Sequence, residues 1–289
     1  MTDLTDLADV RRRYAKEVLA AAGVEDEALE DAFASVKRED FLGPGPWQIQ
    51  RFGVSLKYEP TPDDDPRHLY VNALFGILPE RQLNNGQPSF HAALMHHTAP
   101  KTGERVVHIG AGVGYYTAIL ARMVGDTGHV TGIEFVPELA VRAKANFAAW
   151  PNVEIIAGDG ALVEFGAADI IYVNAGATRP ADAWLGRLSD GGRLILPLTI
   201  DKTFLPEFDK ITPGCVFRID RRGDDYFAKC ISSVAIFPCA GSRDPVSERA
   251  LAKALEKGGV ARVTRLYRSD DIPEERCWLR APGWSLAYD

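Results

Sequence analysis

The sequence predicts an α/β protein with a doubly wound, mostly parallel sheet that ends in an antiparallel hairpin. Three observations support this fold class. Short apolar stretches alternate with amphipathic ones between residues 105 and 198, as parallel strands and their covering helices do. A glycine-rich turn follows the first of these stretches. Further along the chain, two apolar stretches flank Arg222-Gly223-Asp224, which is typical of a hairpin turn.

The residues before the sheet predict helices and an irregular segment. A helix is expected over residues 9–22, with Asp9 as its cap and Gly23 after its end, and a second helix is expected to begin at Asp26. Proline and glycine concentrate in residues 43–68, which favours irregular structure. Residues 69–78 are apolar and fit either a short strand or a packed loop, and a helix is expected from residue 90 to residue 98.

The central region predicts five strands, at residues 105–109, 129–134, 153–158, 169–175 and 193–198. Helices are expected between them at residues 115–125, 137–150 and 181–188. The hairpin, over residues 215–237, brings the expected sheet to seven strands. A C-terminal extension is expected to contain a helix at 245–257 and strands near 261–267 and 276–280.

This pattern divides the chain into three expected parts. Residues 1–80 form an N-terminal helical cap with an irregular segment, residues 81–240 form the domain built on the sheet, and residues 241–289 form the extension. No linker in the sequence is flexible enough to prove a split into separate domains.

Composition excludes several classes of function. The 289-residue chain is 46% hydrophobic and carries a net charge of −7, which argues against non-specific binding to nucleic acid or to an anionic membrane. Its four cysteines form no C-x-x-C pair and no histidine cluster accompanies them, so neither a metal site nor a disulfide framework is expected. The N-terminus lacks the apolar core of a signal peptide, and no stretch is long and apolar enough to span a membrane. A cytoplasmic location is therefore expected.

The glycine-rich turn HIGAGVGYYT, at residues 108–117, predicts a ligand site at the start of a helix. Its candidate binding residues are Gly110, Ala111, Gly112, Gly114 and Tyr115. A dinucleotide fingerprint would have its third glycine where Tyr115 stands, and a phosphate-binding P-loop would need a Gly-Lys-Ser or Gly-Lys-Thr sequence that is absent. The turn can still let a ligand approach its backbone, with helix N–H groups directed at a carboxylate.

Polar residues follow the next strands in order. Glu134 ends the second strand and can accept both ribose hydroxyls, and Asp159, beside Gly160, can accept an adenine amine. Asn174 follows the fourth strand, and the carboxyl ends of strands are where open α/β sheets bind ligands. Each residue alone is more often a solvated strand end. As an ordered set they favour an adenosine that carries a small zwitterion and no pyrophosphate, which describes S-adenosylmethionine (SAM); NAD is the alternative.

At this point the chain resembles a known family, the protein-L-isoaspartate O-methyltransferases. The resemblance rests on HIGAGVGYYTAILARMVGDTGHVTGIEFVPELA, followed in order by GDG (158–160), DIIYVNAGA and GGRLILPL (191–198), and on REDFLGP and the FRIDRRGDDYF hairpin. It covers about residues 10–240. The resemblance implies the fold of SAM-dependent methyltransferases, SAM as the cofactor and a carboxylate in a protein, peptide or small molecule as the methyl acceptor.

The segment LNNGQPSF, at residues 83–90, departs from the family at one position. In the family a serine or threonine precedes the Gln-Pro or Ala-Pro pair and lies close to the methyl donor, whereas Gly86 precedes Gln87 here. Asn72 and Thr199 also stand where the family has other residues. No catalytic residue is assigned; Asn85, Gln87 and Ser89, with Asn84 beside them, are candidates to replace the hydroxyl, and a plain polar turn is the alternative.

Three histidines follow this segment, and the functional hypothesis leaves alternatives open. His91, His96 and His97 could act as a base, but surface or helix-end roles are favoured. A SAM-dependent methyltransferase of the isoaspartyl type is the first interpretation. A methyltransferase with a different peptide or small-molecule substrate, and a non-catalytic protein that keeps the fold to bind SAM or a partner, are the alternatives. The sequence leaves the oligomeric state and the role of residues 245–289 open.

Overall fold

The computed structural model describes residues 4–51, 57–200 and 212–289. The chain forms two compact units. The first comprises Met1–Glu104 and Ala111–Ala157, and the second comprises Arg105–Gly110 and Gly158–Asp289. Residues 108–110 of the glycine-rich turn therefore belong to the second unit, and residues 111–117 belong to the first. The division into residues 1–80, 81–240 and 241–289 stays a prediction about the sequence.

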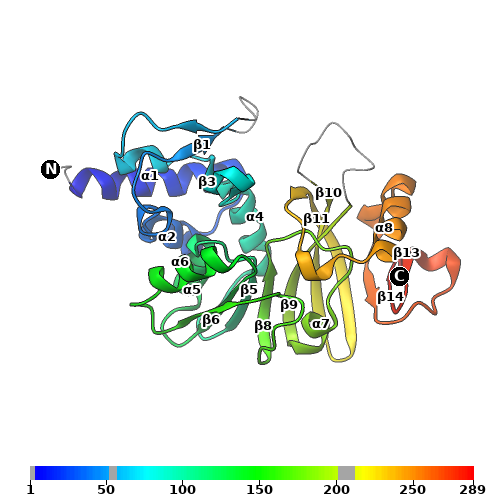
Figure 1. Cartoon of the computed structure of the whole chain (residues 1–289). Helices are drawn as coiled ribbons and strands as arrows, with labels where there is room; N and C mark the ends of the chain where they lie inside the picture. The colour runs from blue at the N-terminus through cyan, green and yellow to red at the C-terminus, as the bar shows by residue number, and fades with distance from the viewer. Residues whose placement is uncertain (1–3, 52–56, 201–211) are drawn as a thin grey trace. The chain divides into compact units, whose positions relative to one another are not determined.

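Helices dominate the first unit (Figure 1). They are α1 (Leu4–Ala22), α2 (Glu27–Ser35), α3 (Glu39–Leu42), α4 (Pro88–Thr98), α5 (Tyr115–Val124) and α6 (Pro137–Asn146), with the 3₁₀ turns η1 (Pro66–Leu69) and η2 (Pro79–Arg81). The helices expected near residues 90–98, 115–125 and 137–150 are confirmed. The first helix was expected to be capped by Asp9, which is wrong, because α1 begins at Leu4 and Asp9 lies inside it, bound to Arg12.

The first unit also contains six strands among its described residues. A four-stranded sheet has the order β2-β1-β3-β4, formed from β1 (Gln48–Gln50), β2 (Glu59–Pro60), β3 (Leu74–Leu78) and β4 (Leu83–Asn84). Residues 69–78, which fitted a strand or a packed loop, thus provide β3. The parallel pair β6 (His129–Glu134) and β7 (Val153–Ala157) aligns Val130 with Val153. This pair matches two of the expected central strands.

The second helix begins where it was expected, and Asp26 is its N-terminal cap. The Asp26 Oδ1 atom accepts a hydrogen bond from the Leu29 backbone N–H at 3.1 Å, and its Oδ2 atom lies 3.0 Å from His96 Nδ1. A capping side chain satisfies a backbone N–H that the helix leaves without a partner.

We expect Asp26→Ala to lower the free energy of unfolding by about 1 kcal/mol, because alanine cannot accept that bond. Asp26→Asn should retain most of the stability, since asparagine caps equally well. Denaturant unfolding measures both variants. Glu25→Ala, which removes the neighbouring exposed carboxylate and no cap, is the control; an equal loss for Glu25→Ala would show that the cap contributes nothing.

Arg38, from the REDFLGP motif, is fully buried in the first unit. Its guanidinium carbon lies 4.8 Å from the ring centroid of Phe75 and 5.2 Å from that of Tyr115, at distances typical of cation–π contacts. Its Nη1 atom donates to the Val71 carbonyl at 3.0 Å. Arg38 therefore fixes the backbone just before Asn72, which contacts the LNNGQPSF segment.

The second unit is built on one mixed sheet (Figure 1). Its strands follow the order β13-β14-β12-β11-β10-β9-β8-β5. They are β5 (Arg105–Ile109), β8 (Ala168–Val173), β9 (Leu188–Thr199), β10 (Thr212–Arg222), β11 (Asp225–Ile236), β12 (Arg265–Tyr267), β13 (Cys277–Ala281) and β14 (Trp284–Ala287). Its helices are α7 (Asp182–Arg187) and α8 (Pro245–Lys257), with the 3₁₀ turns η4 (Ala240–Ser242), η5 (Val260–Arg262) and η6 (Glu274–Arg276).

Strand pairing confirms the α/β class and corrects the strand count. The pairs β5–β8 and β8–β9 are parallel, and the predicted hairpin β10–β11 is antiparallel. The pairs that join β11, β12, β14 and β13 are antiparallel as well. The sheet is therefore mixed, and this unit alone has more strands than the seven expected for the whole sheet. The reason is that the C-terminal extension adds strands to the edge beyond the hairpin.

Candidate active site

The glycine loop of the first unit is joined to Glu134 by a backbone hydrogen bond. The Gly112 N–H donates to Glu134 Oε2 at 2.6 Å, and the Val136 N–H donates to Glu134 Oε1 at 2.8 Å. The Ala111 N–H donates to the Ile133 carbonyl at 3.2 Å, which continues the ladder from β6 into the loop. The loop then turns through Gly114 into α5, whose first residue is Tyr115. The structure thus brings together the candidate residues that lie in this unit.

The carboxylate of Glu134 is mostly buried, with 6% of the residue exposed. Burial raises the pKa of Glu134, and the backbone N–H groups that it accepts offset part of this rise. A carboxylate offers about four lone-pair directions, and two of them are used by Gly112 and Val136. The remaining ones are suited to two hydroxyl donors, as a ribose would supply.

In the second unit, Gly110 and Asn174 connect the ends of β5 and β8. The Asn174 backbone N–H donates to the Ile109 carbonyl at 2.8 Å, and its side-chain Nδ2 donates to the Gly110 carbonyl at 3.3 Å. The expectation that Asn174 lies at the carboxyl end of a strand is confirmed, since β8 ends at Val173. Its amide is used to hold the glycine turn.

Asp159 and Gly160 open the turn after β7. Asp159 Oδ1 accepts a hydrogen bond from the Ala161 N–H at 2.9 Å, and the Gly160 carbonyl accepts one from the buried indole of Trp184 at 2.7 Å. Gly241, in η4, lies directly against this carboxylate, because a Cβ built on Gly241 would be 1.8 Å from Asp159 Oδ2. A side chain at position 241 would displace the Asp159 carboxylate. No pattern in the sequence predicts this contact.

Thr199, which departs from the family pattern, is bound to the C-terminal extension. Its Oγ1 and carbonyl oxygen both accept hydrogen bonds from Arg243 Nη1, each at 3.0 Å. Arg243 Nη2 in turn forms an ion pair with Glu248 of α8 at 2.5 Å. Thr199 therefore binds a segment that follows the hairpin.

The candidates of the LNNGQPSF segment are held by neighbours in the first unit. Asn85 Oδ1 accepts the Phe75 N–H at 2.8 Å, and Gln87 Nε2 donates to the Asn72 carbonyl at 3.2 Å. The Ser89 N–H donates to Asn72 Oδ1 at 3.0 Å, and Asn72 Nδ2 donates to Ser89 Oγ at 2.9 Å. Asn72, another departure from the family, thus binds both Gln87 and Ser89 of this segment.

Two polar atoms of these candidates remain available. Asn85 Nδ2 and Gln87 Oε1 are buried and have no hydrogen-bond partner among the described residues. A buried polar atom without a partner is costly, so such atoms often mark a place that a ligand completes. Asn85 Nδ2 can donate to a carboxylate.

The position of His91 explains why glycine, and not the serine typical of the family, stands at position 86. It has φ +77°, and a Cβ at this position would lie 2.3 Å from Nε2 of His91. The His91 ring is stacked on Tyr116, with ring centroids 3.7 Å apart, and the Tyr116 hydroxyl donates to the Gly86 carbonyl at 3.0 Å. His91 is 1% exposed, so the favoured surface or helix-end role is wrong for it. The imidazole occupies the space that a serine side chain would need.

The fold, together with the glycine loop that is hydrogen-bonded to Glu134, defines the class of the SAM-dependent methyltransferases. Two solved structures share the fold. A protein-L-isoaspartate O-methyltransferase aligns with a TM-score of 0.58 at 22% identity, over 90% of this chain and 74% of its own. A putative protein-L-isoaspartate O-methyltransferase from Plasmodium falciparum, in complex with S-adenosyl-L-homocysteine, aligns with a TM-score of 0.60 at 17% identity, over 79% and 97%.

The chain belongs to the Protein-L-isoaspartate(D-aspartate) O-methyltransferase (PCMT) family, whose sequence model matches residues 64–223. Relatives named protein-L-isoaspartate O-methyltransferase are 30% identical in Thermotoga maritima, over 63% of this chain and 54% of that protein, and 28% identical in Ignicoccus hospitalis, over 80% and 98%. Protein-L-isoaspartate O-methyltransferase 1 of Archaeoglobus fulgidus is 35% identical, over 48% and 70%. The predicted family, enzyme class and SAM dependence are confirmed.

Two kinds of feature are absent from the described residues. No helix among residues 4–51, 57–200 and 212–289 is long and apolar enough to cross a membrane. The same residues contain no group of histidine, cysteine and acidic side chains that could hold a metal ion.

Proposed function

We propose that this protein transfers the methyl group of SAM to a side-chain carboxylate in a peptide or protein, with an isoaspartyl residue as the first acceptor to test. Membership of the PCMT family supports the reaction. The observation that carries the proposal for this chain is the buried, unpartnered Nδ2 of Asn85, beside Gly86. It provides a hydrogen-bond donor for a carboxylate in the segment where the family has a hydroxyl.

The cofactor would be held by the residues that the sequence singled out. SAM supplies a methyl group on a cationic sulfonium. Glu134 accepts the ribose hydroxyls with the lone pairs that Gly112 and Val136 leave open. Asp159 accepts the adenine amine, and the backbone of Gly112 and Gly114 approaches the amino-acid part. Gly110, Ala111, Tyr115, Gly160 and Asn174 shape these positions.

Little proton transfer is required of the protein. A carboxyl group titrates near pH ~4, so the acceptor is ionised at neutral pH and no general base has to activate it. The task of the acceptor segment is to orient one carboxylate oxygen toward the methyl carbon. Asn85 Nδ2 performs this by donating to the second oxygen, and His91 with Tyr116 keeps the Gly86 backbone in place.

The proposal predicts methyl transfer to an isoaspartyl peptide. Incubation with methyl-labelled SAM should label that peptide and not the same peptide with aspartate at the same position. Mild base should then release the label as volatile methanol, because the product is an ester. Label on the aspartyl peptide alone, or on a small carboxylic acid alone, would replace isoaspartate with that acceptor. SAM binding without transfer to any acceptor would favour a non-catalytic protein.

We infer that the sheet follows the doubly wound, Rossmann-like plan of SAM methyltransferases, with the C-terminal strands added to its edge. The partner is a protein or peptide carrying the acceptor carboxylate, and neither nucleic acid nor membrane is involved. A cytoplasmic location, where intracellular proteins age and form isoaspartate, fits this role.

A further inference from the structure

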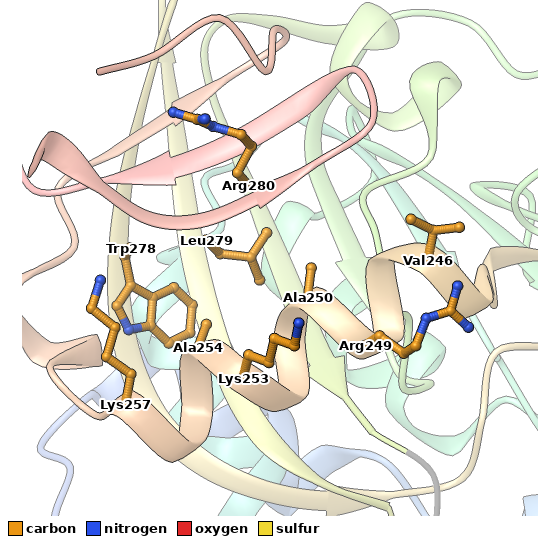
Figure 2. A pocket seen from close by; sticks show the side chains of 9 residues that line it. All are labelled: Val246, Arg249, Ala250, Lys253, Ala254, Lys257, Trp278, Leu279 and Arg280. Atoms are coloured by element: carbon orange, nitrogen blue, oxygen red, sulfur yellow. The ribbon is translucent and has the colours of Figure 1, made fainter. Parts of the chain in front are cut away.

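A groove lies between α8 and β13, in the C-terminal extension and outside the residues that the family model matches (Figure 2). Its volume is about 400 Å³. Trp278 and Leu279 of β13 form its apolar floor, and both are buried. The Trp278 indole donates to the Gly258 carbonyl at 2.9 Å, which fixes the floor to the end of α8. The groove is therefore a formed feature of the second unit.

Cationic side chains border this groove, and no carboxylate lines it. Arg249, Lys253 and Lys257 follow one another at every fourth residue of α8, and Figure 2 shows them spaced along the helix. Arg280 lies across from them on β13 and pairs weakly with Glu274, at 3.8 Å. No ion pair joins a described carboxylate to any of the three α8 cations.

The charge of this groove is opposite to that of the whole protein, whose net charge is −7. A row of cations without carboxylate partners on an acidic protein favours the binding of a negatively charged ligand at this surface. The net negative charge disfavours nucleic acid, because its long phosphate backbone would extend over the acidic remainder of the surface. A short acidic segment has the negative charge that complements the cations of the groove. It is too short to extend over the acidic remainder of the surface, which would repel it.

The geometry fits an extended chain. Successive cations on α8 are separated by about 6 Å along the helix axis, and alternate residues of an extended peptide are about 6.7 Å apart. β13 is the last strand of its sheet and pairs only with β14 among the described residues. Three consecutive residues, Trp278 to Arg280, line the groove, and the β13–β14 register is irregular between Cys277 and Leu279, where the alternation of side chains is broken.

We propose that this groove binds an acidic, extended segment of the peptide or protein that carries the methyl acceptor. The inference rests on the proposed function for its substrate class. Carboxylates at alternate positions of the segment pair with Arg249, Lys253 and Lys257, and its apolar side chains contact Trp278 and Leu279. Binding here selects acceptors that carry an acidic segment.

Fluorescence anisotropy with a labelled Glu-Ala-Glu-Ala-Glu peptide tests this binding without any methyl transfer. The triple variant Arg249→Glu/Lys253→Glu/Lys257→Glu should lower its affinity about tenfold or more, because three favourable exposed pairs become repulsive. Arg187→Glu/Lys229→Glu/Arg268→Glu changes the net charge equally on exposed cations of the same unit outside the groove and should change the affinity little at physiological salt, where distant charges are screened. Equal losses in both triple variants would overturn the proposal.

Two further binding measurements distinguish the acidic segment from other ligands of the groove. The neutral peptide Gln-Ala-Gln-Ala-Gln should bind the native protein weakly; equal binding of both peptides would overturn the acidic specificity. A single-stranded oligothymidylate that binds more tightly than the acidic peptide, and loses affinity in the groove variant, would assign the groove to nucleic acid instead. If the triple variant does not fold, Arg249→Gln/Lys253→Gln provides the same comparison with less change.

Kinetics separate the groove from the proposed reaction. For an isoaspartyl peptide that also carries the acidic segment, the groove variant should raise KM with kcat unchanged, since the groove binds and does not contact the reacting atoms. Transfer that is equally efficient with and without the acidic segment would contradict the selection of acceptors. Absence of transfer to every peptide, with acidic binding retained, would contradict the proposed function and support the groove as a binding site.

Discussion

Serine at position 86, the residue typical of the family, is expected to lower the free energy of unfolding by roughly 2–5 kcal/mol. The left-handed backbone conformation of Gly86, with φ +77°, costs a residue with a Cβ about 1–2 kcal/mol. The Cβ would also lie 2.3 Å from His91 Nε2, and forced insertion into a packed site costs about 1–3 kcal/mol. His91 cannot turn away freely because it is buried and stacked on Tyr116.

A matched variant separates these two costs in denaturant unfolding. Gly103→Ser has a similar backbone conformation, φ +86°, but its Cβ would meet only Thr127 Oγ1 at 3.6 Å, an ordinary contact. It should show the backbone cost alone. Adding His91→Ala to Gly86→Ser should restore the part of the free energy of unfolding that the collision removes. The gain should be partly offset, because alanine also removes the stacking of His91 on Tyr116. If Gly86→Ser and Gly103→Ser are equally destabilised, His91 does not occupy the serine position.

The same collision predicts the outcome for activity. Introducing serine alone should not increase methyl transfer to an isoaspartyl peptide, because its hydroxyl can enter only by displacing the imidazole that orders the segment. Initial rates measured at a temperature where Gly86→Ser remains folded test this. A clear increase in rate would show that the serine reaches the acceptor without disturbing His91, and Asn85 would then not be the needed donor.

The sequence predicted those features that depend on neighbours along the chain. The alternation of apolar strands and amphipathic helices between residues 105 and 198 placed β5 at Arg105–Ile109 and β6 at His129–Glu134, as the structure has them. The second helix was predicted to begin at Asp26, and Asp26 caps α2 through a contact that spans only three residues. Glu134 was placed at a strand end and connects to the glycine loop, since strand and loop belong to one local unit.

Features that depend on packing between distant segments were missed. Nothing in the local pattern shows that His91 occupies the Cβ position of Gly86, because this requires the ring to be held against Tyr116. The contact of Gly241 with Asp159 joins residues far apart in the chain. The strand β14 was missed for a related reason. Its sequence is short, and it forms a strand because it pairs with β12 and β13.

Neutralising Glu134 is expected to weaken SAM binding by roughly 1.5–3 kcal/mol, or about 10- to 150-fold in dissociation constant. Glu134→Gln keeps the size of the side chain but has one acceptor oxygen, where the carboxylate has two that bind Gly112 and Val136. The ribose hydroxyls then lose a charged acceptor, and an amide NH₂ faces a backbone N–H. Calorimetric titration with SAM measures the loss. Glu138→Gln, which removes an exposed carboxylate on α6, is the control and should leave the affinity unchanged.

The pH dependence of SAM binding gives an independent test of the same residue. Burial raises the pKa of Glu134, so on acidification this carboxylate takes up a proton at a higher pH than an ordinary glutamate, which titrates near pH ~4.3. The charged form accepts the ribose hydroxyls, and therefore the native protein should lose affinity for SAM as the pH falls through that raised pKa. Glu134→Gln cannot titrate and should lack this decline while starting from a lower affinity. If both proteins show the same decline, a different group controls it, and Glu134 does not bind the ribose as an ionised carboxylate.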